Sequence, residues 1–196
     1  MAKDGKRYKT KMCRAYLDLL IGCMFSGKST ELIRRIERFQ FAKKRCVVLK
    51  WSKDVRGDEE ITELSTHGGH KISCIRVNKL MTFAKYSKNY DVIGVDDGQF
   101  FPDIEEFCEM MVDKEKKIVI VAGLDADFRR NPFENIIRLV SKAEKVKKLS
   151  AICTVCGRKA HFSALLSKKN FEEREVIQVG GMESYTALCR RCYLKT

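Results

Sequence analysis

Hydrophobic residues along the chain form short runs that alternate with segments of helical spacing. The run YLDLLI at residues 16–21 predicts a buried strand that leads into a glycine turn. From about residue 26 to 43 the apolar positions recur at helical spacing, at Leu32, Ile33, Ile36 and Phe39. Residues 46–49 form another short β-branched run. This strand, helix and strand predict a βαβ unit with parallel strands and a right-handed crossover.

The same alternation continues through the next hundred residues. Further strands are expected at 71–77, 92–95 and 118–122. Helical spacing is expected at 80–86 and 103–112, with another helix starting near Pro132. Residues 51–70 are polar, contain glycine and show no clear period, so they are expected to form a long mobile loop. The pattern is typical of an α/β fold with a parallel sheet.

The sequence pattern changes after about residue 150, where cysteine pairs, turns and short strands replace the alternation of strands and helices. We therefore expect three parts. Residues 1–14 are a basic, mobile tail, residues 15–149 a core domain, and residues 150–196 a small lobe. The chain shows no internal repeat and no low-complexity linker.

Composition narrows the class of protein. A hydrophobic share of 44% and a charged share of 33% fit a soluble globular chain. No run approaches the roughly 20 apolar residues of a membrane helix. The apolar stretch 19–25 enters a glycine motif rather than a signal-peptide cleavage site. We therefore expect a cytoplasmic protein with no membrane partner, whose nine cysteines are reduced.

The net charge of +13 suits a polyanionic partner, such as nucleic acid, acidic lipid or the triphosphate of a nucleotide. Solvated surface lysine and arginine are the alternative source of this charge, and a basic tail alone does not establish nucleic-acid binding.

The segment GCMFSGKS matches the phosphate-binding pattern G-x-x-x-x-G-K-[ST] and stands between the first expected strand and helix. Its glycines let backbone N–H groups turn toward phosphate oxygens, Lys28 places a cation on the β- and γ-phosphates, and Ser29 is a magnesium ligand. The helix N-terminus adds to anion binding. A glycine turn that binds nothing is the alternative. The predicted phosphate-binding residues are Gly22, Cys23, Met24, Phe25, Ser26, Gly27, Lys28, Ser29 and Thr30.

Two acids end the hydrophobic strand at 92–95. The carboxyl ends of parallel strands are where open α/β sheets bind ligands. Asp96 is therefore suited to hold magnesium, and Asp97 to accept a proton from an attacking hydroxyl. The alternative is that both merely cap the following loop.

Two Cys-x-x-Cys pairs occupy the C-terminal lobe. Four thiolates of this kind form a closed, tetrahedral structural zinc site. A lobe this small needs such a metal to fold. Two disulfides are the alternative. The expected zinc ligands are Cys153, Cys156, Cys189 and Cys192.

Aromatic residues follow two of the expected strands. Together they suggest a flat pocket for an aromatic base, although each taken singly is more often a core residue: Phe100, Phe101, Phe128 and Phe133.

In these motifs the chain resembles the type II, or cytosolic-type, thymidine kinases. The resemblance rests on GCMFSGKSTELIRR, KDVR followed by STHGG, VIGVDDGQFFPDIEEFCE, IVIVAGLDADFRRNPF, both cysteine pairs and VIQVGGMESY. It covers about residues 17–193. It implies a P-loop, RecA-like core with a small C-terminal zinc-binding lobe, assembled as a homotetramer.

The resemblance also implies the nucleoside site. A lasso between Ser163 and Tyr185 would close over the base, Met24 and Ser163 would border its 5-methyl group, and Arg56 would touch donor phosphates. The implied substrate-binding residues are Met24, Gln99, Phe100, Leu124, Phe128, Phe133, Ser163, Val176, Gly180, Gly181 and Tyr185.

Two departures from the family pattern stand out. The usual Asp-Glu-Gly-Gln-Phe-Phe has become Asp-Asp-Gly-Gln-Phe-Phe, so that Asp97 replaces the catalytic glutamate. The carboxylate remains, but its reach is shorter by one methylene. Ala164 and Leu165 stand where basic residues are usual, and the lasso is a few residues longer.

From this we expect a kinase that transfers the γ-phosphoryl group of ATP, with Mg²⁺, to the 5′-hydroxyl of thymidine. Deoxyuridine is a second candidate acceptor and dTTP a feedback ligand. Two alternatives are a nucleic-acid-associated ATPase and a kinase relative that has lost catalysis. Intact Lys28, Ser29 and Asp96 oppose the latter.

Overall fold

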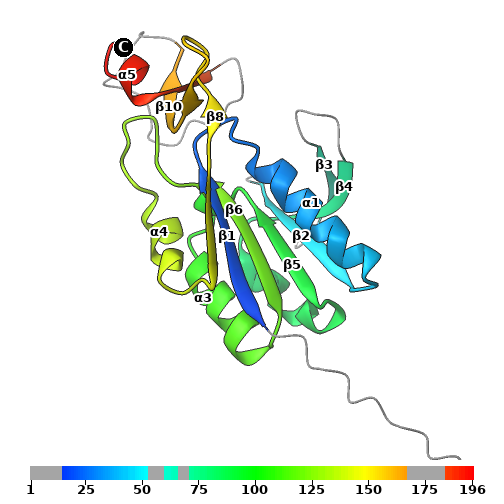
Figure 1. Ribbon diagram of the computed structural model, residues 1–196. Helices are drawn as coiled ribbons and strands as arrows, with labels where there is room; N and C mark the ends of the chain where they lie inside the picture. Colours follow the sequence, from blue (N-terminus) through cyan, green and yellow to red (C-terminus); the bar gives the residue numbers. More distant parts are fainter. Residues whose placement is uncertain (1–14, 53–59, 66–70, 167–183) are drawn as a thin grey trace, which may run out of the picture.

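The computed structural model describes residues 15–52, 60–65, 71–166 and 184–196. Its centre is a seven-stranded sheet in the order β3-β4-β2-β5-β6-β1-β7, in which every neighbouring pair is parallel except β3 and β4. The predicted α/β fold with a parallel sheet is therefore confirmed (Figure 1). The strands are β1 (Tyr16–Gly22), β2 (Cys46–Trp51), β3 (Glu60–Ser65), β4 (Lys71–Val77), β5 (Val92–Asp96), β6 (Ile118–Leu124) and β7 (Lys145–Leu149).

Helices cover both faces of this sheet, as the alternating sequence pattern requires. On one face α1 (Lys28–Phe41) packs Leu32, Ile33 and Ile36 onto the strands. The other face carries α2 (Leu80–Phe83), α3 (Ile104–Glu109) and α4 (Glu134–Val140). Because the strands are buried on both sides, β5 and most of β6 have no exposed side chain.

The helix expected at 80–86 is only partly α-helical, because α2 continues as a 3₁₀ segment, η1 (Ala84–Asn89). Likewise α3 ends in the π-helical segment η3 (Met110–Lys114). A short 3₁₀ turn, η2 (Gly98–Phe100), follows β5. The helix expected near Pro132 begins at Glu134.

Two strands differ from the sequence expectation. The segment 51–70, expected to be a loop without regular structure, contains β3, which pairs antiparallel with β4 at the sheet edge. Strand β7 was not expected either. It pairs with β1 at the opposite edge, and the side chains of its first four residues are exposed. Edge strands with lysines resist pairing with other chains.

The residues after β7 form two small antiparallel sheets and a short helix. These are β8 (Ala151–Ile152) with β9 (Lys159–Ala160), β10 (Phe162–Leu165) with β11 (Tyr185–Leu188), and α5 (Arg190–Tyr193). This lobe lies at the end of the sheet where β1 leads into α1 (Figure 1). The tail 1–14 lies outside the described residues, as does the central part of the expected lasso, residues 167–183.

Candidate active site

The loop between β1 and α1 has the backbone that the phosphate-binding motif predicts. At Gly22 the φ angle is 149°, and a Cβ there would lie 2.5 Å from the carbonyl oxygen of Leu149. Only glycine fits this close approach. Gly27, with φ 78°, stands immediately before the first helical residue, Lys28. The Ser26 hydroxyl donates to the Cys23 carbonyl at 2.8 Å and closes the turn.

The Lys28 ammonium is held within this loop. Its Nζ donates to the carbonyl oxygen of Cys23 at 2.7 Å. Burial lowers the pKa of Lys28, while Cys23 and the carboxylates of Asp96, Asp97 and Asp125 act in the opposite direction. The cation therefore lies at the same edge of the sheet as the acids Asp96 and Asp97.

Asp96 ends β5 beside the first turn of α1. The hydroxyl of Ser29 donates to its Oδ1 at 2.8 Å, so the two expected magnesium ligands are adjacent. Asp96 is only 2% exposed. Burial, followed by the nearby charge of Asp97, raises the pKa of Asp96 to about 7. A hydroxyl and a carboxylate side by side are oxygen ligands of the kind that Mg²⁺ prefers, so these residues fit the ion.

Asp97 has different surroundings from its neighbour. Its backbone is left-handed, with φ 55°, and its side chain is 39% exposed. It precedes η2, but its side chain forms no capping hydrogen bond there. The side chain lies instead toward Lys50, whose Nζ is 3.8 Å from Asp97 Oδ2. An accessible carboxylate beside a phosphate loop is suited to accept a proton.

The expected aromatic pocket divides into surface and core residues. Phe100 is half-buried and packs on Trp51, with ring centroids 4.9 Å apart. Phe101 is fully buried in the same core cluster as Ile104 and Phe107 of α3, so it is a core residue, the alternative that the sequence left open, and not a pocket residue. Phe133 is half-buried at the start of α4. Phe128 is 4% exposed, and its carbonyl accepts a hydrogen bond from the Tyr193 hydroxyl at 2.7 Å.

Gln99 connects η2 with β6. Its side-chain oxygen accepts a hydrogen bond from the backbone N–H of Leu124 at 3.0 Å, and the residue is 6% exposed. Asn135 of α4 donates to the carbonyls of Gln99 and Phe101. The segment that carries Asp97 is thereby fixed to the sheet and to α4.

The lobe contacts the phosphate loop directly. The backbone N–H of Met24 donates to the hydroxyl of Ser163 at 3.0 Å, and Ser163 is 5% exposed. The Cys23 thiol points to the carbonyl of Ala160 at 3.5 Å. Cys23 belongs to the same buried cluster as Ala151, Ala160 and Leu188. The structure thus brings together Met24 and Ser163, which the family resemblance implies at one pocket.

A cavity of about 420 Å³ lies beside α1, and a second of about 370 Å³ lies between Phe128 and the lobe. Ala164 and Leu165, which stand where the resemblance implies basic residues, line the second cavity together with Thr154, Thr186 and Tyr193. Tyr185 is 9% exposed and pairs with Leu165. Of the remaining expected residues, Arg56, Val176, Gly180 and Gly181 lie outside the described part of the chain.

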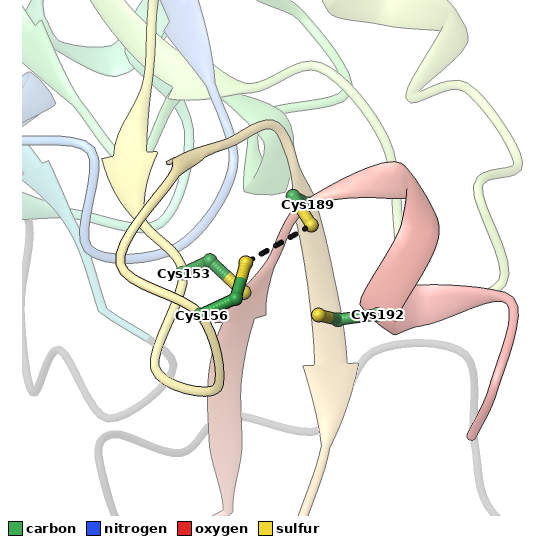
Figure 2. Close-up of side chains that lie close together, drawn as sticks. All are labelled: Cys153, Cys156, Cys189 and Cys192. Carbon is green, nitrogen blue, oxygen red and sulfur yellow. Dashed lines mark hydrogen bonds between the residues drawn. The ribbon is translucent and has the colours of Figure 1, made fainter.

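The four lobe cysteines converge from the turn between β8 and β9 and from the start of α5 (Figure 2). Their sulfur atoms all lie within 4.8 Å of one another, and Cys156 Sγ is 3.5 Å from Cys189 Sγ. Tetrahedral zinc with bonds of about 2.3 Å places its sulfur ligands about 3.8 Å apart, so the donor set fits zinc. The cysteines are free, and a sulfur separation of 3.5 Å is far longer than the disulfide bond of about 2.05 Å.

The thiols of this cluster do not ionise alike. Hydrogen bonds from backbone amides, that of Cys189 first, lower the pKa of Cys153 to about 6. Burial raises the pKa of Cys192 to about 12. Four adjacent thiolates repel one another, and a divalent cation is the group that stabilises all of them together.

Sequence reasoning missed two charged residues of the site. Lys50 follows the expected strand 46–49 directly, and Lys148 at the end of β7 pairs with Asp125 at 2.6 Å. A polar residue at the carboxyl end of a parallel strand was the available signal for Lys50. No such signal existed for Lys148, because β7 itself was not expected.

Comparison with known proteins agrees with this geometry. The sequence profile of the family described as thymidine kinase matches residues 15–193. The chain is 46% identical to the thymidine kinase of vaccinia virus (strain Western Reserve) over 179 residues, which cover 91% of this chain and 97% of the relative.

Two further relatives show similar agreement. Thymidine kinase 1 of Dictyostelium discoideum is 44% identical over 90% of this chain and 77% of its own length. The thymidine kinase of Yaba monkey tumor virus (strain VR587) is 46% identical over 92% of this chain and 95% of its own length. With the phosphate loop, the acid pair and the cysteine cluster in place, the chain belongs to the thymidine kinase family.

Proposed function

We propose that this enzyme of the thymidine kinase family transfers the γ-phosphoryl group of MgATP to the 5′-hydroxyl of thymidine, giving dTMP. The observation that carries the proposal is the contact of Ser29 with Asp96, which joins the phosphate loop to the acid pair at the end of β5. That contact supports one site for donor, metal and acceptor.

ATP would bind on the loop from Gly22 to Thr30. The backbone N–H groups of this loop and the N-terminus of α1 favour phosphate oxygens, and Lys28 would move from the Cys23 carbonyl to the β- and γ-phosphates. Mg²⁺ bound with ATP neutralises charge on the phosphoryl oxygens, and Ser29 and Asp96 would hold it. Arg56, outside the described residues, remains a proposed donor contact.

Asp97 would accept the proton of the attacking 5′-hydroxyl. It is the more accessible of the two acids, and Asp96 already accepts a hydrogen bond from the Ser29 hydroxyl. A positioned general base contributes typically about 10²- to 10⁴-fold to rate. In-line attack on the γ-phosphorus then needs positioning and charge stabilisation rather than covalent chemistry by the protein.

The nucleoside would lie between the loop and the lobe. Met24 and Ser163 support this location because a hydrogen bond already joins them. Phe100 would offer aromatic surface, and the largely buried Phe128 lines the cavity beside the lobe. Gln99 and Leu124, which share a hydrogen bond, would lie behind the base. Phe133, Tyr185 and the lasso residues Val176, Gly180 and Gly181 complete the proposed set, the lasso residues lying outside the described part.

Zinc would be structural, held by Cys153, Cys156, Cys189 and Cys192 with no ligand position left for substrate. The described residues contain no helix long and apolar enough to cross a bilayer. Cytoplasmic location, a homotetrameric assembly and feedback by dTTP belong to the same proposal.

The test is to incubate the purified chain with MgATP and a panel of nucleosides and to separate the products by chromatography. The proposal expects monophosphate from thymidine, with or without deoxyuridine, and none from purine nucleosides. No product from any nucleoside would indicate a relative without catalysis. ATP hydrolysis that needs DNA or RNA, without a nucleotide product, would indicate a nucleic-acid-associated ATPase.

A further inference from the structure

Lys50 stands at the carboxyl end of β2, next to the acid pair. In the parallel pairing of β2 with β5 its Cα partner is Asp96. Its Nζ lies 3.8 Å from Asp97 Oδ2, and its side chain is 32% exposed. Strand pairing on both sides of β2 fixes this register, so the ammonium reaches Asp97 from a rigid element.

The other ammonium groups at this edge have different partners. Lys28 donates to the Cys23 carbonyl, and Lys148 pairs with Asp125. Among the described residues, the ion pair of Asp97 is formed with Lys50. Asp96 accepts its hydrogen bond from Ser29 of α1, whereas Asp97 pairs with Lys50 of β2, whose charge also acts on Asp96.

We propose that Lys50 is a positioning residue, which holds the Asp97 carboxylate toward the acceptor hydroxyl and away from the magnesium ligands. This inference rests on the proposed function of Asp97. A general base must lie within hydrogen-bond reach of the proton that it accepts, and two free carboxylates beside one cation would compete for it.

The need for such an anchor follows from the backbone. Asp97 has a left-handed φ of 55°, and its side chain forms no capping hydrogen bond, so the loop itself does not fix its rotamer. Aspartate is also shorter than the glutamate that is usual at this position. Misplacement of a reacting group by about 1 Å costs on the order of 100-fold in rate. Lys50 supplies a fixed counter-charge that limits this misplacement.

A direct contact of Lys50 with a donor phosphate is the competing role. The two roles differ in their kinetic signature. A residue that positions Asp97 affects the turnover number and loses its effect when Asp97 is neutralised. A phosphate contact raises the KM for ATP and acts whether or not Asp97 is charged.

The experiment measures steady-state kinetics of Lys50→Met and Lys50→Arg with thymidine and MgATP, with circular dichroism to verify folding. The matched control is Lys142→Met, because Lys142 is also 32% exposed and pairs at 2.6 Å with Glu105 of α3, outside the proposed site. We expect Lys50→Met to lower kcat by about 10- to 100-fold with both KM values within about threefold of the parent. Lys50→Arg restores most of the loss, and the control changes kcat less than about twofold.

The double variant of Lys50→Met with Asp97→Asn decides between the roles. We expect it to be no slower than Asp97→Asn alone. The inference is overturned by an unchanged kcat in Lys50→Met, by a rise in the KM for ATP alone, or by an equal further loss in the double variant. Should Lys50→Met not fold, the same comparison with the neutral variant Lys50→Gln decides. Full turnover by Asp97→Asn would refute the proposed base itself, which is a separate outcome.

Discussion

Asp96 is held in a site that disfavours its charge, so replacing it with asparagine is expected to stabilise the protein while abolishing turnover. Burial and the charge of Asp97 raise the pKa of Asp96 from an ordinary value of 3.8 to about 7. The hydroxyl of Ser29 donates to Asp96 Oδ1, and the asparagine carbonyl can accept the same bond. Active sites commonly exchange stability for function in this way.

The magnitude follows from the pKa difference. At about 1.4 kcal/mol per pKa unit, the ionised carboxylate costs on the order of 4 kcal/mol in the folded state. A buried asparagine amide also needs hydrogen-bond partners, so we expect the variant to gain only about half of this in its free energy of unfolding, ~2 kcal/mol. For a chain of this size that corresponds to about 4–8 °C in Tm.

The sign of the pH dependence is fixed by the direction of the shift. Between the unfolded and folded pKa values the native state binds the additional proton, so the stability of the parent falls as pH rises from about 4 to about 7. The advantage of the Asp96→Asn variant therefore grows over this window and is constant above it. Because the cost of burying the amide does not change with pH, the advantage falls from ~2 kcal/mol at pH 8 to about zero at pH 5.

Urea unfolding at pH 5 and pH 8, in magnesium-free buffer without chelator so that zinc is retained, measures this difference. The control is Asp91→Asn. Hydrogen bonds from Arg45 lower the pKa of Asp91 to about 2, so this change is expected to cause a small loss of stability instead. Equal stability of parent and Asp96→Asn at pH 8, or a gain that does not depend on pH, would refute the reasoning.

Three further predictions concern the lobe and the acid. Ser163→Ala removes the hydrogen-bond acceptor of the Met24 amide, which costs about 1–3 kcal/mol when the amide stays buried. It is expected to weaken binding of a non-hydrolysable ATP analogue, measured by calorimetry, up to about tenfold. Ser163→Thr keeps the hydroxyl and is expected to bind the analogue like the parent. Cys156→Ser is expected to lower bound zinc, measured by mass spectrometry, and the Tm together, whereas Cys46→Ser, outside the cluster, changes neither. Asp97→Glu restores the longer carboxylate and is expected to turn over at the parent rate or faster. These predictions would be contradicted by unchanged ATP affinity in Ser163→Ala, by full zinc content in Cys156→Ser, or by a loss of turnover in Asp97→Glu.

Local signals in the sequence predicted the centre of the fold. The spacing of glycines, Lys28 and Ser29 requires a tight turn between a strand and a helix, and this turn is present. The buried strands were predictable because both of their faces are apolar. The cysteine pairs were predictable because a Cys-x-x-Cys turn places two thiols on one side of a loop.

The edges of the sheet were not predictable in the same way. Strand β7 has the sequence KVKKL, and its first four side chains are exposed, so no apolar pattern marks it. It is a strand because its backbone pairs with β1. Strand β3, EITELS, likewise has a single partner, β4, and lies in a segment rich in polar residues. Pairing of backbones at an edge leaves little trace in side-chain hydrophobicity.

Details of the site depended on register and orientation. Phe100 and Phe101 are neighbours in sequence, yet the first faces Trp51 and the second lies in the core. The pair of Lys50 with Asp97 arises from the alignment of β2 with β5, which the residues alone do not specify. The bond between Met24 and Ser163 similarly depends on how the lobe lies against the phosphate loop.

The most direct test of the proposed mechanism is the rate of phosphoryl transfer by Asp97→Asn in a single-turnover, rapid-quench measurement with thymidine and MgATP. Binding of an ATP analogue is measured in parallel. With Asp97 as the proton acceptor, the rate falls at least about 100-fold while ATP affinity stays within about threefold. An undiminished rate of dTMP formation would contradict the assignment of Asp97.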